Sequence, residues 1–289
     1  MTESAGTDVP GLTHRQVDAG GLRVNLMEAG EGDPVLLLHG WPQTNQMWLA
    51  VIARLAPHYR LLAPDLRGFG RTEAPGTGYD GQTFGRDQIA LLDALGLQRV
   101  KLIGHDWGGW TAMLLGIEHP ERFERMIVID APHPWPRLRL ALLPELWRGW
   151  YATALATPLI GPWLVRRTGF AKGILRRASP PGTFSSDELD TYADSFREPQ
   201  RARAVSALYR YYHSGFLEAF RGRWRSSRLS VPTLLLFGDR DLYVTPELLE
   251  GWEQHADDMR VEIVPGGGHF LVDERPELVS ERALEFFRA

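Results

Sequence analysis

Short apolar runs alternate with helical patterns along the chain from Leu22 onward. The runs predict strands at Val24–Glu28, Val35–His39, Arg60–Pro64, Val100–Gly104, Met126–Asp130, Thr233–Phe237 and Arg260–Val264. Between the runs, apolar residues recur at helical spacing in three sets, namely Ile89, Leu92 and Leu95; Leu248, Leu249 and Trp252; and Leu278, Ala283 and Phe287. This alternation predicts an α/β fold with a mainly parallel sheet covered by helices.

The alternation stops between about Pro134 and Arg225, in a segment that is rich in Leu, Trp, Tyr and Arg and is interrupted by prolines. It contains no convincing strand, so we expect a helical insertion. Because the insertion directly follows a strand, it would lie over the carboxyl ends of the strands, where open α/β sheets bind ligands. We therefore expect a helical cap at 134–225, inserted into a core made of 1–133 and 226–289.

Composition narrows the classes of partner. The 289 residues are 44% apolar and carry a net charge of −4, so there is no basic field to attract nucleic acid or an anionic membrane. A small neutral or hydrophobic ligand fits better, and the choice between monomer and homodimer stays open. Basic residues other than Lys101 and Lys172 are all arginine, which suggests a GC-rich bacterial genome.

Cysteine is absent, which excludes disulfides, thiolate metal sites and cysteine nucleophiles and suits a reducing cytoplasm. Residues Met1–Gly11 lack the basic-then-apolar order of a secretory signal. The most apolar stretch, Gly149–Val165, is shorter than the ~20 residues of a membrane span and is broken by prolines. We therefore expect a cytoplasmic protein.

The segment VKLIGHDWGG at 100–109 carries the first candidate for chemistry. An apolar strand runs into Gly104, His105 and Asp106, and a helix is predicted at Trp110–Glu118. This pattern is typical of a nucleophile elbow, a strained strand-to-helix turn with small residues on either side that exposes its central side chain. Asp106 occupies the place of the serine in serine hydrolases. An isolated Asp here could equally be a helix N-cap, so the choice between nucleophile and N-cap depends on the other motifs.

A second motif, VLLLHGWP at 35–42, ends a predicted strand in a loop whose backbone N–H groups can face an anion. In an elbow enzyme the oxyanion hole uses this loop and the residue after the nucleophile. The N–H groups of Trp41 and Trp107 are therefore the candidates.

Two further strand ends supply an acid and a base. In TLLLFGDRD at 233–241, Asp241 is the candidate for orienting a histidine, whereas Asp239 is more simply a solvated turn residue. In VPGGGHF at 264–270, His269 follows three glycines that allow a tight bend, and it is the candidate base. The order nucleophile, acid, histidine is the order used with the elbow. Asp130, just past its own strand, remains the alternative acid.

With GHDWGG, HGWP and the segment DLRGFGRT at 65–72, nearly the whole chain resembles the α/β-hydrolase superfamily, in particular its epoxide hydrolase and haloalkane dehalogenase branch. The resemblance implies the α/β-hydrolase fold, with a mostly parallel central sheet, flanking helices and an inserted helical cap. No histidine pair has metal-ligand spacing, and Gly68 and Gly70 lack the third glycine of a dinucleotide fingerprint. We expect no metal and no cofactor.

In such an enzyme the ionised Asp106 attacks a saturated carbon and forms an alkyl ester, which water activated by His269, held by Asp241, then hydrolyses. Epoxide opening also calls for a proton donor to the leaving oxygen. Tyr151 and Tyr209 resemble the two ring-opening tyrosines of epoxide hydrolases. For the second tyrosine, the nearby residues Tyr211 and Tyr212 keep the assignment open.

The same motifs help to choose between an epoxide hydrolase and a dehalogenase. A haloalkane dehalogenase is expected to carry Asn where Trp41 stands. HGWPQ nearly reproduces the HGFPQ of haloacetate dehalogenases, but those enzymes place arginines where Trp107 and Trp110 stand. An epoxide hydrolase acting on a small hydrophobic epoxide with water is therefore the favoured reading, a dehalogenase the alternative, and a catalytically silent binding protein of this fold the third.

Overall fold

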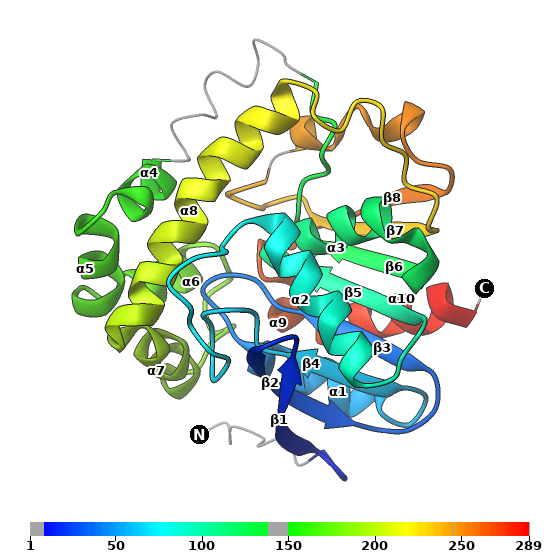
Figure 1. Ribbon diagram of the computed structural model, residues 1–289, viewed down its shortest axis with the longest axis horizontal. Helices are drawn as coiled ribbons and strands as arrows, with labels where there is room; N and C mark the ends of the chain where they lie inside the picture. Colours follow the sequence, from blue (N-terminus) through cyan, green and yellow to red (C-terminus); the bar gives the residue numbers. More distant parts are fainter. Residues whose placement is uncertain (1–8, 138–149, 245, 289) are drawn as a thin grey trace.

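The computed structural model describes residues 9–137, 150–244 and 246–288. One sheet of eight strands has the order β1-β2-β4-β3-β5-β6-β7-β8 (Figure 1). The first two pairings, β1 with β2 and β2 with β4, are antiparallel, and every pairing from β4 to β8 is parallel. The strands are β1 Thr13–Ala19, β2 Leu22–Ala29, β3 Pro34–Leu38, β4 Arg60–Pro64, β5 Val100–His105, β6 Phe123–Ile129, β7 Thr233–Gly238 and β8 Met259–Val264.

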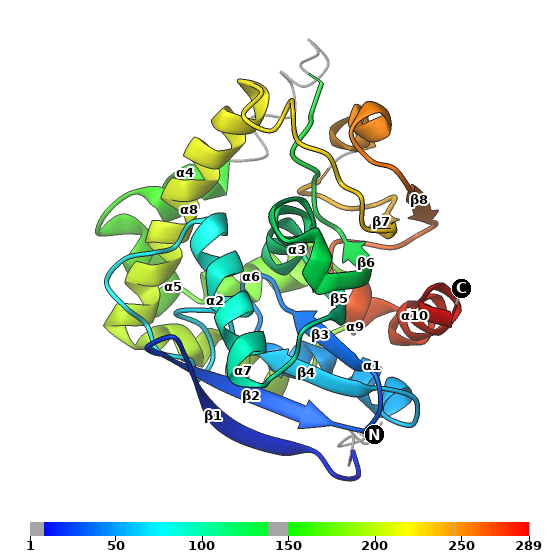
Figure 2. The ribbon, with the colours of Figure 1, turned by 45° about the vertical axis from the view of Figure 1, so that its right-hand side comes forward.

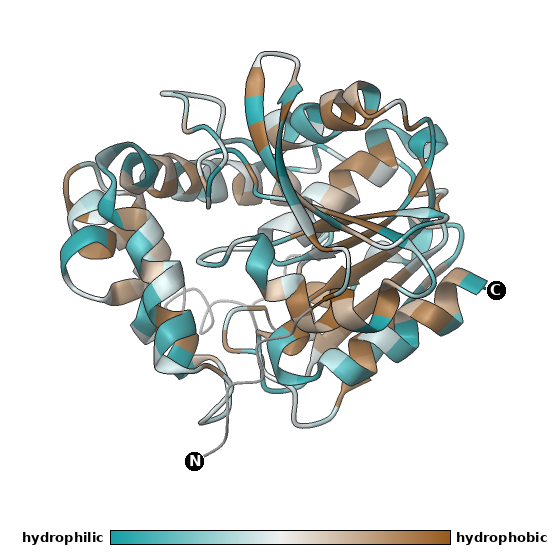
Figure 3. Ribbon diagram, turned by 90° about the horizontal axis from the view of Figure 1, so that it is seen from below, coloured by the Kyte–Doolittle hydropathy of each residue, from teal (hydrophilic) through white to brown (hydrophobic). Residues whose placement is uncertain are grey.

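Helices cover both faces of the sheet (Figure 2). On one face, α2 (Gly81–Ala94) and α3 (Trp107–Glu118) pack on the even-numbered side chains of β3, Leu36 and Leu38. On the other face, α1 (Leu49–Leu55) and α10 (Pro276–Arg288) pack on the odd-numbered ones, Val35 and Leu37. Because side chains alternate along a strand, a sheet buried on both faces needs continuous apolar strands. Figure 3 shows these strands as the hydrophobic centre of the molecule.

The strands agree with the predicted ones to within a few residues at each end, and the predicted α/β-hydrolase fold is confirmed. Strand β1 was not predicted. It lies at the sheet edge with only Val17 and Ala19 buried, so it has no apolar run to reveal it.

The helix predicted from Leu248, Leu249 and Trp252 is wrong. The chain forms two short 3-10 turns instead, Pro246–Leu249 and Trp252–Gln254. Gly251 lies between them as the N-cap of the second turn, with φ 113°, a left-handed backbone that a continuous helix does not allow. An added Cβ at this position would lie 2.4 Å from the carbonyl oxygen of Trp135, so the chain passes too close for another residue.

The segment after β6 forms helices, and none of its described residues lies in a strand. We call α4 to α8 the helical insertion. Helix α8 packs on α4 and α5 (Figure 1), and Ser206 of α8 donates a hydrogen bond to the Leu155 carbonyl of α4 at 2.5 Å. The bounds are α4 Trp150–Ala156, α5 Ile160–Arg167, α6 Phe170–Arg177, α7 Ser186–Asp194 and α8 Pro199–Phe220. The limits 134–225 for a cap stay a prediction.

None of the described helices combines the length and the apolar character that a bilayer crossing needs. Part of the apolar stretch Gly149–Val165 lies outside the described residues, and its described part forms α4 and most of α5.

Candidate active site

Asp106 lies in the sharp turn between β5 and α3, with φ 50° and ψ −114°. This backbone conformation is strained for a residue with a side chain, and it turns that side chain out of the sheet. The turn closes only because its neighbours are glycines. An added Cβ at Gly104 would lie 2.4 Å from the Gly108 carbonyl oxygen, and one at Gly108 would lie 2.2 Å from the Leu38 carbonyl oxygen. The elbow predicted from GHDWGG is therefore present in the backbone.

The loop after β3 lies against the carboxylate of Asp106. The Trp41 N–H donates a hydrogen bond to Oδ2 at 2.9 Å, and the Trp107 N–H also bonds the carboxylate. Gly40 is required for this approach, since an added Cβ would lie 2.6 Å from Oδ2. Buried His39 fixes the loop, because its Nε2 accepts from the Leu66 N–H at 2.9 Å and its Nδ1 then donates to the Gly40 carbonyl at 3.0 Å.

His269 faces Asp106 from the loop that follows β8. Its Nε2 lies 3.8 Å from Asp106 Oδ1, and its Nδ1 lies 2.8 Å from Oδ2 of Asp241. Asp241, in the loop after β7, is itself held because its Oδ1 accepts from the N–H groups of Tyr243 at 2.7 Å and Val244 at 3.1 Å. Asp106, His269 and Asp241, which were expected from their order in the sequence, thus lie next to one another, with His269 between the two acids.

Asp130, the alternative acid, is fully buried at the end of β6. Its carboxylate accepts hydrogen bonds from the N–H groups of Gly238 at 2.9 Å and Leu271 at 3.4 Å. Burial, followed by the charge of Asp241, raises the pKa of Asp130 well above its usual value. Among the described contacts its carboxylate has no hydrogen bond to His269, so the geometry favours Asp241 as the histidine's partner.

Burial and mutual charge set the protonation of the facing pair. Burial raises the pKa of Asp106 to about 6, although His269 and the two N–H donors partly oppose the rise. For His269, burial lowers the pKa, but the charge and hydrogen bond of Asp241 and the charge of Asp106 outweigh it, and the pKa rises to about 9. At neutral pH, Asp106 is mainly an anion that faces a cationic His269.

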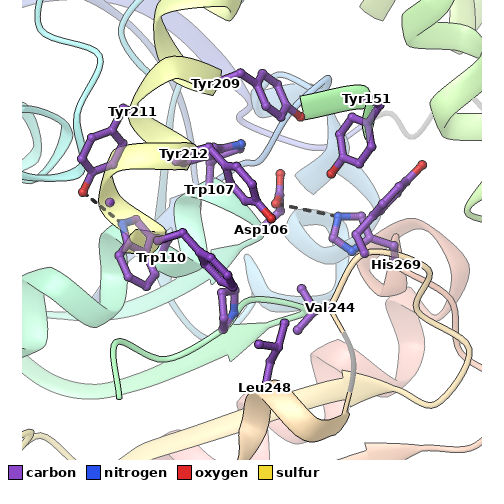
Figure 4. A pocket seen from close by; sticks show the side chains of 14 residues that line it. Asp106, Trp107, Trp110, Tyr151, Tyr209, Tyr211, Tyr212, Val244, Leu248 and His269 are labelled. Carbon is purple, nitrogen blue, oxygen red and sulfur yellow. Dashed lines mark hydrogen bonds and ion pairs between the residues drawn. The ribbon is translucent and has the colours of Figure 1, made fainter. Parts of the chain in front are cut away.

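The helical insertion brings tyrosines over this pair. Tyr151 of α4 and Tyr209 of α8 line the same pocket as Asp106 and His269, with their ring centroids 5.8 Å apart. Figure 4 shows both hydroxyls directed into the space above Asp106. Burial, then the nearby tyrosines and Asp106, raises the pKa of each hydroxyl well above its usual value. Both hydroxyls are therefore protonated at neutral pH and able to donate.

The other two candidate tyrosines differ in orientation. The Tyr211 hydroxyl turns towards Trp110, whose indole N–H lies 3.4 Å from it (Figure 4). Tyr212 lines the pocket, and burial followed by the Asp106 charge raises its pKa. Tyr243 also lines the pocket, with its ring centroid 5.1 Å from that of Tyr151, and sequence reasoning missed it. Its position two residues after Asp241 was the available signal.

The pocket enclosed by these residues is apolar and has a volume of about 70 Å³. This exceeds the ~10–15 Å³ that one water requires, so the pocket has room for more than a single water. No arginine or lysine of the described residues lines it. Within the described ranges, no group of three His, Asp or Glu side chains could hold a metal ion.

Comparisons with known proteins give the family of the chain. The model of the alpha/beta hydrolase fold family matches residues 33–276. The soluble epoxide hydrolase of Corynebacterium sp. (strain C12) is 31% identical, over 96% of this chain and 97% of the relative. The fluoroacetate dehalogenase of a Burkholderia species is 28% identical, over 96% and 94%. The solved structure of the epoxide hydrolase CorEH without ligand superposes with a TM-score of 0.82 at 28% identity, over 96% of this chain and 99% of that chain. The chain therefore belongs to the α/β hydrolase fold family.

Proposed function

We propose that the protein is an epoxide hydrolase that opens epoxides to vicinal diols through an alkyl ester on Asp106. The observation that carries this proposal is the pair of hydroxyls, Tyr151 and Tyr209, directed into the space above the carboxylate (Figure 4). An epoxide differs from an alkyl halide because its leaving group is an alkoxide, which needs a proton. Two protonated hydroxyls beside the nucleophile can donate that proton.

In the first step, a carboxylate oxygen of Asp106 attacks one ring carbon of the epoxide. The new carbon–oxygen bond is that of an ester, and the ring carbon–oxygen bond breaks. The leaving oxygen takes a proton from Tyr151 or Tyr209, and the tyrosinate is reprotonated from solvent. Because Oδ2 is held by the Trp41 N–H, the attacking atom is Oδ1.

In the second step, water hydrolyses the ester. Ester formation removes the Asp106 charge, which is one cause of the raised pKa of His269. That pKa therefore falls, and the neutral Nε2 can accept a proton from water while hydroxide attacks Cγ of Asp106. The N–H groups of Trp41 and Trp107 stabilise the tetrahedral oxyanion. Its collapse releases the diol, whose oxygen takes the proton from His269, and Asp106 is restored.

A dehalogenase acting through the same ester is the competing proposal, since a fluoroacetate dehalogenase is among the relatives. A haloacid carboxylate would need cationic partners in the pocket. Trp107 and Trp110 occupy the places beside the nucleophile, and none of the described lining residues is Arg or Lys. These observations favour a neutral substrate over a haloacid.

Trapping the ester tests the proposal directly. The His269→Gln variant lacks the base for the second step, so it should accumulate an adduct on Asp106 when incubated with styrene oxide. The adduct is detected by intact-mass and peptide mass spectrometry. The matched control is the Asp106→Asn, His269→Gln double variant, which should gain no mass.

The same variant incubated with 1-bromobutane separates the two chemistries. A styrene-oxide adduct without a butyl adduct supports the epoxide hydrolase. A butyl adduct alone would identify a haloalkane dehalogenase instead. The absence of both adducts would contradict the covalent mechanism and favour a binding protein of this fold.

A further inference from the structure

Glu274, at the end of α9 (Leu271–Glu274), holds the loop that carries His269. Its Oε2 accepts a hydrogen bond from the Gly268 N–H at 2.7 Å, and its Oε1 accepts one from the Phe270 N–H at 3.2 Å. A single carboxylate thus binds the backbone on both sides of the proposed base. Glu274 itself lies outside the pocket lining, and its hydrogen bonds to the site run through this loop.

The remaining backbone groups of His269 are fixed from two other directions. Its N–H donates to the Ala178 carbonyl, which caps α6 of the helical insertion, at 3.1 Å. Its carbonyl lies 2.7 Å from Nε2 of His105, the residue before the nucleophile. Burial and the neighbouring His269 lower the pKa of His105 to about 3, so the His105 ring is neutral and donates from Nε2. The loop is therefore fastened to α9, to the insertion and to the elbow.

Gly268, the residue before His269, allows these close contacts. An added Cβ at Gly268 would lie 2.6 Å from Glu274 Oε1 and 2.7 Å from the Ala178 carbonyl oxygen. Burying a carboxylate is costly unless it is well hydrogen-bonded. Here burial raises the pKa of Glu274, while the two N–H groups and His269 oppose the rise. The loop thus needs glycine at 268 to approach Glu274, and the Glu274 carboxylate needs the N–H groups of the loop as hydrogen-bond donors.

We infer that Glu274 is a positioning residue for His269, which orients the imidazole between Asp241 and the ester carbon of Asp106. The inference rests on the proposed function. Ester formation needs Asp106 and a proton donor, whereas ester hydrolysis needs a water aligned by His269. Loss of Glu274 should therefore slow the second step and leave the first step nearly unchanged, a separation that general loosening of the fold would not produce.

Single-turnover kinetics with styrene oxide measure the two steps separately. In Glu274→Gln an amide NH₂ meets one of the two N–H donors, so one hydrogen bond is lost. We expect ester decay to slow by about 10- to 100-fold, as small misplacements of catalytic groups do, and ester formation to change by less than about twofold. The matched control is Glu277→Gln, three residues later, which removes an exposed surface ion pair to Arg54. Equal slowing of both steps, or unchanged decay, would overturn the inference.

A second measurement does not depend on turnover. The proton on His269 Nδ1, shared with Asp241 at 2.8 Å, is expected to give a low-field proton NMR signal in the wild type and in Glu277→Gln. In Glu274→Gln this signal should shift or broaden, and an unchanged signal would refute the positioning role. If the wild type forms no ester, the proposed function fails while this spectrum still tests Glu274. Should Glu274→Gln not fold, Glu274→Asp replaces it, since the shorter carboxylate reaches only one of the two N–H groups.

Discussion

At the scale of single residues, the site combines a strained backbone with close atomic contacts. Asp106 is held at φ 50°, a conformation that costs a residue with a Cβ about 1–3 kcal/mol. The surrounding backbone maintains it, because Leu38, Gly104 and Gly108 approach too closely for the turn to relax. The carboxylate is consequently presented to the pocket and to the Trp41 N–H rather than to the sheet.

Tyr151 and Tyr209 should each contribute to epoxide opening. Replacing Tyr151 or Tyr209 by Phe removes one donor and is expected to slow ester formation about 10- to 100-fold, with a larger loss in the double variant. Tyr211→Phe should have a much smaller effect, because its hydroxyl faces Trp110. Stopped-flow tryptophan fluorescence with styrene oxide measures the rate. An undiminished rate in the double variant would remove Tyr151 and Tyr209 from the mechanism.

Ester formation should depend on pH through Asp106. The raised pKa of about 6 means that the carboxylate is ionised above pH 6 and protonated below it. The rate should therefore be level from pH 7 to 8 and fall about tenfold per pH unit below about 6. His269, with a pKa of about 9, stays protonated across that range and adds no second inflection. A profile that is flat down to pH 4.5, measured by single turnover, would contradict the assignment.

Several site residues were predictable and others were not, for physical reasons. Asp106, His269 and Asp241 stand in motifs whose order and strand ends mark them. Glu274 acts through hydrogen bonds to backbone groups, which leave no mark in a sequence pattern. The choice among neighbouring tyrosines likewise depends on which face of α8 meets the pocket, and residues 209, 211 and 212 lie too close along the helix for spacing to decide.

At the scale of elements, the carboxyl ends of adjacent parallel strands bring the acids together. Asp130 follows β6 and Asp241 lies in the loop after β7, so either could have served the histidine. Asp241, three residues beyond the end of β7, meets Nδ1 of His269, whereas Asp130 directly follows β6 and accepts hydrogen bonds from the Gly238 and Leu271 N–H groups. The two acids therefore have different partners.

The two acids should respond differently to substitution by Asn. Asp241→Asn removes the charge that orients His269 and should slow ester hydrolysis by roughly 10³- to 10⁴-fold. Asp130 accepts hydrogen bonds from two backbone N–H groups and makes none to His269 among the described contacts, so its replacement affects ester decay only indirectly. A change of only a few fold is expected for Asp130→Asn. The measurement is the rate of ester decay in each variant. If Asp130→Asn slowed decay more than Asp241→Asn, Asp130 would be the acid that orients His269.

Strands were predicted where they carry an apolar run and missed where they do not. Beyond their first residues, strands β4 and β7 are apolar because helices cover both faces of the sheet. Strand β1 has one mostly exposed face and left no apolar run. The segment around Leu248 has helical spacing, but Gly251 adopts a left-handed backbone that a periodicity cannot reveal.

At the scale of the whole molecule, residues far apart in sequence converge on one pocket. Asp106, Tyr209 and His269 come from β5–α3, the helical insertion and the loop after β8 (Figure 1). The alternation of strands and helices predicted the parallel sheet, and hence the edge where these ends meet. The packing of the insertion against that edge depends on contacts such as Ala178 with His269, which a pattern does not encode.

The tight glycine frame around Asp106 has a consequence for how such proteins diverge. At positions 40, 104 and 108 any side chain collides with neighbouring atoms, whereas at 106 the side chain projects into open pocket. Exchange of the nucleophile therefore leaves the scaffold intact, while exchange of a frame residue destroys it. The frame thus constrains the backbone but not the chemical identity of the group at its centre.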